Sequence, residues 1–184
     1  RVRNGSAYLS KRPTALRDKA IILTLLDTGT RVSELVGINI GDIEFEVGRI
    51  LVSGKGQKQR YIYLGKLCRQ ILWRYITARY PRTTPPADEP LFLHKDGIHK
   101  MTRQGILLLV RSLGEKASVQ NVHPHRFRHT YAIQFLRNGG NIFELQHILG
   151  HEDLAMVRNY VQLAQLDIEN AARRASPADN WRLR

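Results

Sequence analysis

The residues most able to do chemistry are concentrated between His123 and Tyr160, a stretch rich in histidine and arginine that ends on a tyrosine. His125 and Arg128 are three residues apart, so a helix would present both side chains on one face. Arginine forks bind phosphate oxygens, histidines donate or accept protons, and a tyrosine hydroxyl can act as a nucleophile. This stretch therefore contains the side chains of a phosphoryl-transfer site that uses no metal.

Tyr160 is the candidate nucleophile for attack on a DNA phosphate. Because free tyrosine has a pKa of about 10, the hydroxyl needs nearby arginines and a histidine to lose its proton. The transition state spreads negative charge over the non-bridging oxygens, which two arginine forks match better than lysines do. The departing 5′ oxygen needs a proton, and a lysine on a hairpin tip can deliver it. Arg31 and Lys55 are the upstream candidates for the second arginine and this lysine.

Two histidine pairs raise the alternative of a metal site. His125 with His129, and His147 with His151, stand four residues apart, the spacing at which a helix presents two ligands to zinc. Neither pair encloses the glutamate of a zinc-protease motif, and Gly150 is expected to end the helix before His151. Neighbouring arginines and lysines would also repel a dication. We expect no metal and no cofactor.

Composition and charge indicate a folded, nucleic-acid-binding chain. The 184 residues suit one domain, the formal net charge is +13, and the basic residues are spread along the whole length. Such a spread favours a groove around a DNA duplex, with a solubility surface or an acidic protein partner as alternatives. No apolar run approaches the ~20 residues that span a bilayer. The single cysteine, Cys68, fits a reducing cytoplasmic setting, and we interpret it as part of the core.

Hydrophobic periodicity predicts an α+β fold, mostly helical with a small three-stranded antiparallel sheet. Strands are expected at 49–53 and 60–64, with a third at 43–46 joined by a turn at Val47-Gly48. The helix at 66–80 should bury Leu67, Ile71, Leu72, Tyr75 and Ile76. The other helices are expected, from caps and apolar stripes, at 14–28, 30–35, 102–117, 125–138, 142–149, 153–161 and 166–174.

Several basic residues are placed where they could contact DNA. Lys55 falls in a glycine-rich hairpin tip, where glycines let the backbone approach a ligand; an ordinary solvated turn lysine is the alternative. Lys58 and Arg60 beside it are further DNA-contact candidates. Arg103 and Gln104 open the helix at 102–117, where contacts with phosphate or bases and a purely structural role are both open.

These residues match the motifs of a known family. Arg31 in TGTRVSEL, Lys55 in SGKGQKQR, the segment HPHRFRHT, LGHEDL and Tyr160 resemble the boxes of the tyrosine recombinase (phage integrase) family. The spacings of 24, 70, 3, 23 and 9 residues are similar to those of its Xer-type bacterial members. The resemblance covers about residues 14–172. One departure is Phe127, where the family more often has leucine; an apolar ring is expected to pack in the same way.

The resemblance implies how the phosphate would be held and attacked. Arg31 and Arg128 would bind the scissile phosphate, and His151 would donate a hydrogen bond to one of its oxygens. Tyr160 would form a 3′-phosphotyrosyl link. That link conserves the energy of the broken bond, so rejoining would need neither ATP nor metal.

The resemblance also implies the proton transfers and the partners. Lys55 would protonate the leaving 5′ hydroxyl, and His125 would assist proton transfer at the tyrosine. The substrate would be double-stranded DNA, cut by a homo-tetramer on paired sites, with accessory DNA-bending proteins as further partners. The segment 166–174 is the candidate for docking onto a neighbouring subunit.

The expected domain organisation is a single catalytic domain over residues 1–184. Family members usually carry a helical N-terminal domain that clamps the other side of the DNA, and we expect this domain to be absent from this chain. Three other functions stay open. They are a type IB topoisomerase-like enzyme with the same chemistry, a non-catalytic DNA-binding accessory protein of the same fold, and a basic RNA-binding or ribosome-binding module.

Overall fold

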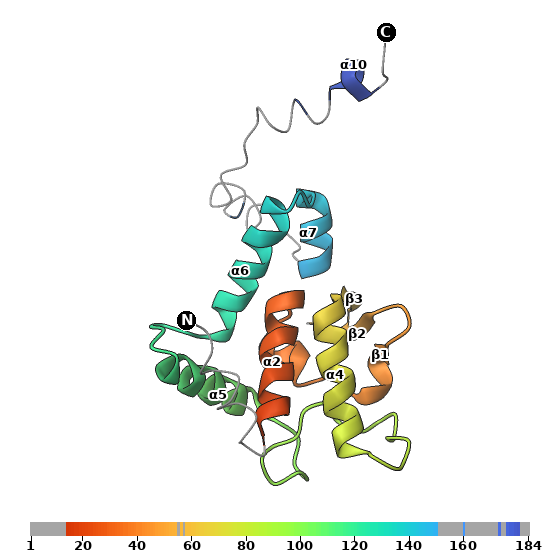
Figure 1. The fold of residues 1–184 in the computed structure, drawn as a ribbon, viewed down its shortest axis with the longest axis vertical. Coiled ribbons are helices and arrows are strands. Elements are labelled where there is room, and N and C mark those ends of the chain that lie inside the picture. The colour runs from red at the N-terminus through yellow and green to blue at the C-terminus, as the bar shows by residue number, and fades with distance from the viewer. Residues whose placement is uncertain are drawn as a thin grey trace.

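A computed structural model describes residues 14–54, 56, 58–150, 160, 173 and 176–180. In Figure 1, α2 (Ala15–Thr28) and α4 (Lys66–Arg79) lie side by side beside a small sheet, with α6 and α7 beyond the C-terminal end of α2. The other elements are α3 (Val32–Leu35), a 3₁₀ turn η1 (Ile40–Asp42), β1 (Ile43–Glu44), β2 (Arg49–Ser53), β3 (Gln59–Tyr63), α5 (Arg103–Lys116), α6 (Pro124–Arg137), α7 (Ile142–Leu149) and α10 (Pro177–Asn180).

The predicted three-stranded antiparallel sheet is confirmed, in the order β1-β2-β3. Ile50 pairs with Ile62, and both are fully buried, so the inner face of the sheet packs on the core. The first strand is shorter than predicted because the chain turns after Glu44, with Gly48 at a φ of 77°. The N–H of Gly54 donates to the carbonyl of Lys58 at 2.8 Å and closes the glycine-rich hairpin between β2 and β3.

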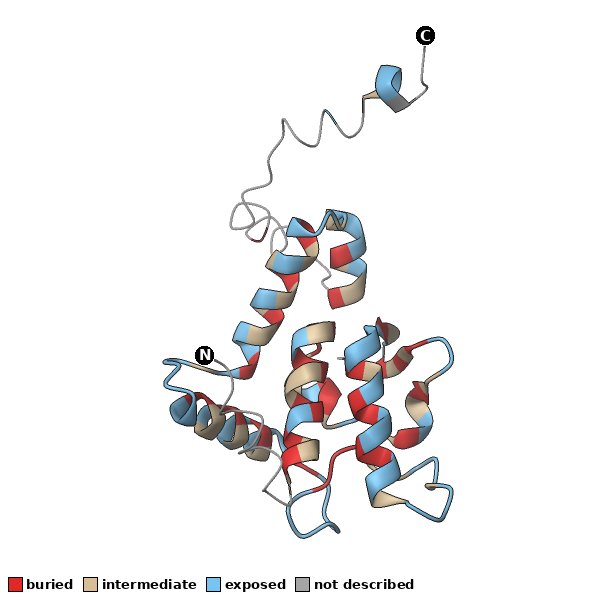
Figure 2. Ribbon diagram, viewed as in Figure 1, coloured by how far each residue is buried: buried red, intermediate tan, exposed pale blue. Residues whose placement is uncertain are grey.

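The main core lies between α2, α4 and the sheet. Figure 2 shows buried and exposed positions alternating along α4, as expected for a helix with one covered face. The prediction that Leu67 points inward is wrong, because its side chain is 57% exposed and Cys68 takes the inward position. The buried stripe of α4 therefore runs Cys68, Ile71, Leu72, Tyr75 and Ile76, at helical spacing.

Cys68 is a core residue, as the sequence indicates. Its thiol is 2% exposed, its sulfur lies 3.8 Å from the hydroxyl of Thr24, and burial raises the thiol pKa to about 12. A thiol with this pKa has almost no thiolate at neutral pH and is a poor nucleophile.

The end of α2 brings α6 into contact with the core. The helix stops at Gly29, which adopts the left-handed conformation with a φ of 59°. A Cβ atom at Gly29 would lie 2.6 Å from Cδ1 of Tyr131 on α6, so only glycine permits this approach. At the other end, Thr14 occupies the N-cap position, but its side chain makes no capping bond to the backbone. Its hydroxyl instead donates to the carboxylate of Asp18 at 3.1 Å.

Side-chain caps set the start of α5 and of α7, and a glycine in the left-handed conformation sets the end of α7. The hydroxyl of Thr102 accepts from the N–H of Gly105 at 3.0 Å, which confirms the predicted start of α5. Asn141 caps α7, and Gly150 ends it with a φ of 63°. Phe127 packs against the main core, as expected for an apolar ring at this position.

A second apolar cluster joins α6, α7 and Tyr160. Its buried members are Ala132, Leu136, Leu145, Leu149 and Tyr160. The helices predicted at 153–161 and 166–174 lie outside the described residues except for Tyr160 and Arg173, which are both helical. Over the described part of the chain, no helix has the length and apolar character needed to cross a membrane.

Candidate active site

Three consecutive backbone carbonyls at the C-terminal end of α7 each accept a hydrogen bond from a different arginine. Arg60 on β3 donates to Ile148 O at 2.8 Å, and Arg128 on α6 donates to Leu149 O at 2.7 Å. Arg31, at the start of α3, donates to Gly150 O at 3.2 Å. The last carbonyls of a helix lack intrahelical partners and carry partial negative charge, so they attract cations. This helix end therefore gathers guanidiniums from three distant parts of the chain.

Arg128 is held from two sides. Besides Leu149 O, its guanidinium donates to Gly29 O at 2.8 Å, and the residue is 4% exposed. Burial and the neighbouring charge of Arg31 lower the pKa of Arg128, Glu34 and Tyr160 act in the opposite direction, and the result is a pKa of about 10. The guanidinium remains charged at neutral pH and cannot reorient without breaking two buried hydrogen bonds.

Arg31 is both paired and accessible. Its Nη1 lies 3.0 Å from Oε1 of Glu34, the pairing that its spacing of three residues suggests, yet 41% of its side chain is exposed. Arg31 is therefore partly accessible to solvent although it is paired with Glu34. Its charge also acts on the buried Arg128, and two such guanidiniums suit a ligand with adjacent anionic oxygens.

Glu34 is the residue whose importance sequence reasoning missed. Its carboxylate is 1% exposed and accepts hydrogen bonds from the hydroxyl of Thr30, the backbone N–H of Arg31 and the guanidiniums of Arg31 and Arg60. Burial alone raises the pKa of Glu34, but these hydrogen bonds and the charge of Arg60 outweigh it and lower the pKa to about 2. The sequence contained a signal for this role, because Glu34 stands three residues after Arg31 and can pair with it. The helix that carries Glu34 is short, and its buried residues are Glu34 and Leu35.

Tyr160 reaches this site from a distant part of the chain. The residue is 4% exposed, and its ring lies edge-on to His129, with the centroids 5.2 Å apart. The ring of His129 lies edge-on to that of His125, with the centroids 4.4 Å apart. A continuous row of aromatic rings thus joins His125, at the start of α6, to the tyrosine.

The surroundings of His125 favour its neutral form. Partial burial and the charges of His129, Arg128 and His123 lower the pKa of His125 below its ordinary value of 6.5. An imidazole that is neutral at pH 7 can accept a proton, which is the property required of a general base.

The remaining predicted site residues fall into three groups. Lys55 and His151 lie outside the described residues. Lys58, Arg103 and Gln104 are exposed, the last two in the first turn of α5, and their DNA contacts stay predictions. Arg60 was expected to contact DNA, but its guanidinium is bonded to Glu34 and Ile148 O, so the geometry does not favour that role.

Within the described residues, no three His, Cys, Asp or Glu side chains gather to hold a metal ion.

Known proteins resemble this chain along most of its length. A sequence model of the phage integrase family matches residues 6–166. The tyrosine recombinase XerC of Oceanobacillus iheyensis is 33% identical over 172 residues, which cover 91% of this chain and 56% of the relative. The chain therefore spans about half the length of this curated relative.

Two solved structures share the fold. The crystal structure of XerA recombinase superposes with a TM-score of 0.73 at 32% identity, covering 92% of this chain and 61% of the XerA chain. The Tn1549 transposon integrase, solved in complex with a circular intermediate DNA, superposes with a TM-score of 0.69 at 26% identity, covering 85% and 58% of the two chains.

Proposed function

The chain belongs to the phage integrase family, and from that premise we propose that it is the catalytic part of a site-specific DNA recombinase. The observation that carries the proposal is the meeting of Arg31, Arg128 and Tyr160, which are separated by up to 129 residues, at the end of α7. Two fixed guanidiniums beside a buried tyrosine suit the binding of a phosphodiester and its attack by the phenol oxygen.

The proposed reaction exchanges one phosphodiester for another. The hydroxyl oxygen of Tyr160 attacks phosphorus, the bond from phosphorus to the 5′ oxygen breaks, and a 3′-phosphotyrosyl link forms. Arg31 and Arg128 stabilise the charge that develops on the non-bridging oxygens. Neutral His125 assists removal of the phenol proton by accepting it. In the proposal, Lys55 protonates the departing 5′ oxygen and His151 hydrogen-bonds the phosphate.

Double-stranded DNA is the proposed substrate. The net charge of +13 supports this choice, and so does the DNA complex of the related Tn1549 integrase. The exposed side chains of Lys58, Arg103 and Gln104 are the proposed further contacts. We place the reaction in the cytoplasm, where a single buried cysteine such as Cys68 stays reduced.

Assembly into a homo-tetramer on two DNA sites, with or without DNA-bending proteins, is part of the same proposal. It rests on the family and on an apolar groove between α2, α5 and α6, which includes Ile22, Val110, Leu113 and Phe127. The predicted docking segment, 166–174, is a candidate occupant from a neighbouring copy. Deleting residues 166–184 should then abolish the tetramer on paired sites in analytical ultracentrifugation while single-site binding persists.

A covalent-trap assay tests the reaction class. The protein is incubated with labelled, nicked duplexes from its own genomic neighbourhood, denatured, and examined for a protein–DNA adduct. We expect an adduct with the wild-type chain and none with Tyr160→Phe, which keeps the ring and removes only the hydroxyl. An adduct of equal yield in Tyr160→Phe would show that another group is the nucleophile. Duplex binding without any adduct across these fragments would favour a non-catalytic DNA-binding protein.

Recombination and topoisomerase-like strand passage share this chemistry and differ in their products. Paired sites should yield Holliday junctions if the chain exchanges strands between duplexes. Relaxation of supercoiled DNA without junctions would support the topoisomerase-like alternative.

A longer form that includes the predicted N-terminal clamp should bind DNA more tightly than this chain, and equal affinity would count against the clamp.

A further inference from the structure

We propose that Arg60 is a positioning residue, which holds the carboxylate of Glu34 and the end of α7 in place and thereby orients Arg31 and Arg128. The inference rests on the proposed function, because it matters for catalysis only if these two arginines bind the scissile phosphate. It gives Arg60 a role different from the DNA contact that its place in the sequence suggests.

The guanidinium of Arg60 is committed to partners inside the protein. Its Nη1 and Nη2 bind the two oxygens of Glu34 at 2.6 and 2.9 Å, and its Nε donates to Ile148 O at 2.8 Å. The side chain is 12% exposed, compared with 41% for Arg31. Contact with a DNA phosphate would require breaking a bidentate pair with a buried carboxylate, which is strongly unfavourable.

Glu34 links Arg60 electrostatically to Arg31. Its Oε1 accepts hydrogen bonds from both guanidiniums, at 2.6 Å from Arg60 and 3.0 Å from Arg31. With Arg60 present, the single negative charge is balanced by Arg60, and the charge of Arg31 is available to a phosphate. Without Arg60, the buried carboxylate would have Arg31 as its remaining guanidinium partner and would draw it away from Gly150 O.

The end of α7 links Arg60 mechanically to Arg128. The two arginines donate to the adjacent carbonyls of Ile148 and Leu149. Arg60 also lies directly against the last turn, since a Cβ atom built on Gly150 would be 3.2 Å from its Nε. Loss of Arg60 would leave Ile148 O without this donor and would let the turn that holds Arg128 shift.

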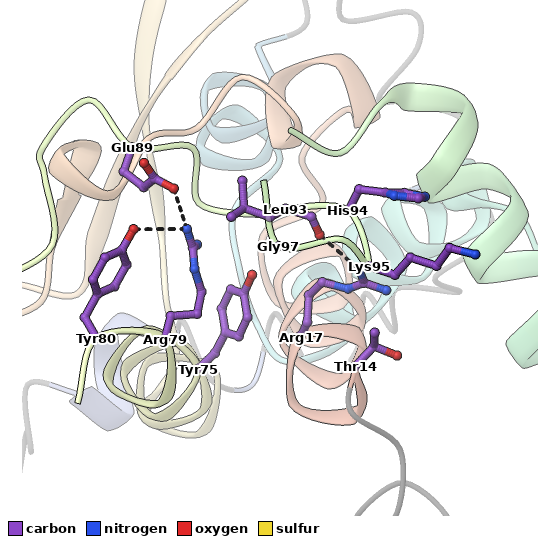
Figure 3. A pocket seen from close by; sticks show the side chains of 10 residues that line it. All are labelled: Thr14, Arg17, Tyr75, Arg79, Tyr80, Glu89, Leu93, His94, Lys95 and Gly97. Carbon is purple, nitrogen blue, oxygen red and sulfur yellow. Dashed lines mark hydrogen bonds and ion pairs between the residues drawn. The ribbon is translucent and has the colours of Figure 1, made fainter. Parts of the chain in front are cut away.

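The variants are Arg60→Gln and Arg60→Lys, and Arg79→Gln is a matched control. Arg79 has the same kind of bonding: it pairs with Glu89 at 2.7 Å, donates to Leu91 O at 2.8 Å, and is 15% exposed. Figure 3 shows it between Tyr75 and Tyr80, near Thr14 and Arg17 at the start of α2. The 14 residues of α2 place it roughly 20 Å from the catalytic arginines.

The first measurement separates binding from the chemical step. At saturating protein, Arg60→Gln should lower the single-turnover cleavage rate by roughly 10- to 100-fold, the range expected when reacting groups are misplaced by about 1 Å. The DNA dissociation constant should change much less than the rate, because the scissile phosphate is one of many phosphates that the protein would contact. Arg60→Lys, which keeps the charge but not the fork, should recover only part of the rate. Arg79→Gln should lose less stability than Arg60→Gln, because its partner Glu89 is 27% exposed and Glu34 is 1% exposed, and it should leave the rate unchanged.

A double-mutant cycle tests whether Arg60 acts through Arg31. In an Arg31→Ala background, Arg60→Gln should cause a smaller loss of rate than in the wild type, because one of the two groups that it orients is gone. Full multiplication of the two losses would overturn the proposal. So would weaker binding with a salt slope lower by ~0.9, the signature of a lost phosphate contact, together with a normal rate at saturation.

An NMR measurement on the protein without DNA decides the inference independently of cleavage. The guanidinium signals of Arg31 should be the same in the wild type and in Arg79→Gln, and should be shifted in Arg60→Gln, because there the group moves toward Glu34 and away from Gly150 O. Unchanged Arg31 signals in Arg60→Gln would refute the positioning role. If the wild type forms no adduct but the Arg31 signals shift in Arg60→Gln, the proposed function fails while the positioning contact stands.

Discussion

The ring of Tyr160 lies edge-on to the ring of His129, with the centroids 5.2 Å apart and the planes inclined by 70°. His129 stands between the tyrosine and His125, and its own ring contacts both. From the sequence, His129 is only one member of a histidine pair at zinc-binding spacing. In the fold it packs the candidate nucleophile against α6.

Replacing His129 should therefore loosen Tyr160 without removing any phosphate-binding group. We expect His129→Leu to weaken the docking of the tyrosine ring by about 0.5–1.5 kcal/mol, the strength of an aromatic pair beyond its buried area. The signals of ¹³C-labelled Tyr160 should shift toward those of an exposed tyrosine. His147→Leu, on an exposed position of α7, is the control. Identical Tyr160 signals in wild type and His129→Leu would contradict a docking role.

Glu34 should make stability depend on pH in the acid range. Its pKa is about 2 in the folded protein and 4.5 for an ordinary glutamate, so the unfolded chain binds the proton more readily. The stabilisation is complete above pH about 4.5 and is lost as the pH falls toward 2, by up to about 3 kcal/mol. Urea unfolding across this range should show the free energy of unfolding falling with pH, and the fall should be smaller in Glu34→Gln. An equal dependence on pH in the wild type and Glu34→Gln would show that Glu34 titrates normally.

His125 should remain neutral at lower pH than an ordinary histidine. Partial burial and the charges of His129, Arg128 and His123 lower its pKa, so its NMR titration midpoint should lie below 6.5. Since the unfolded state then takes up the proton first, His125 costs stability as the pH falls below 6.5. His129→Leu removes one of the opposing charges and should raise the midpoint. A wild-type midpoint at or above 6.5 would argue against His125 as a proton acceptor at neutral pH.

Gly150 should tolerate no side chain. Gly150→Ala places a Cβ on a residue with a φ of 63° and within 3.2 Å of Nε of Arg60. The left-handed backbone alone should lower the free energy of unfolding by about 1–2 kcal/mol. Gly97→Ala isolates this cost, because Gly97 has a φ of 72° and nothing within 4 Å of its built Cβ. Denaturant unfolding should show a larger loss of unfolding free energy for Gly150→Ala than for Gly97→Ala. Equal losses would mean that the Arg60 side chain moves away from the new Cβ at no cost.

Local sequence patterns were sufficient for most of the framework. Apolar spacing predicts the helix over 142–149 with the bounds that the structure shows, and the glycines at 29 and 150 predict where two helices end. These features depend on neighbours within one or two turns. The same logic fails at Leu67 and Cys68, where one residue of helical phase decides which side chain faces the core.

The roles of the arginines required the tertiary structure. Arg31, Arg60 and Arg128 carry the same group, yet the first is accessible, the second is bound on all three nitrogens, and the third is buried. Their bonds to Gly150, Ile148 and Gly29 span 119, 88 and 99 residues. No local pattern encodes contacts at such separations. Residue types and order predict the chemistry, whereas long-range packing decides which cation faces a ligand and which one supports it.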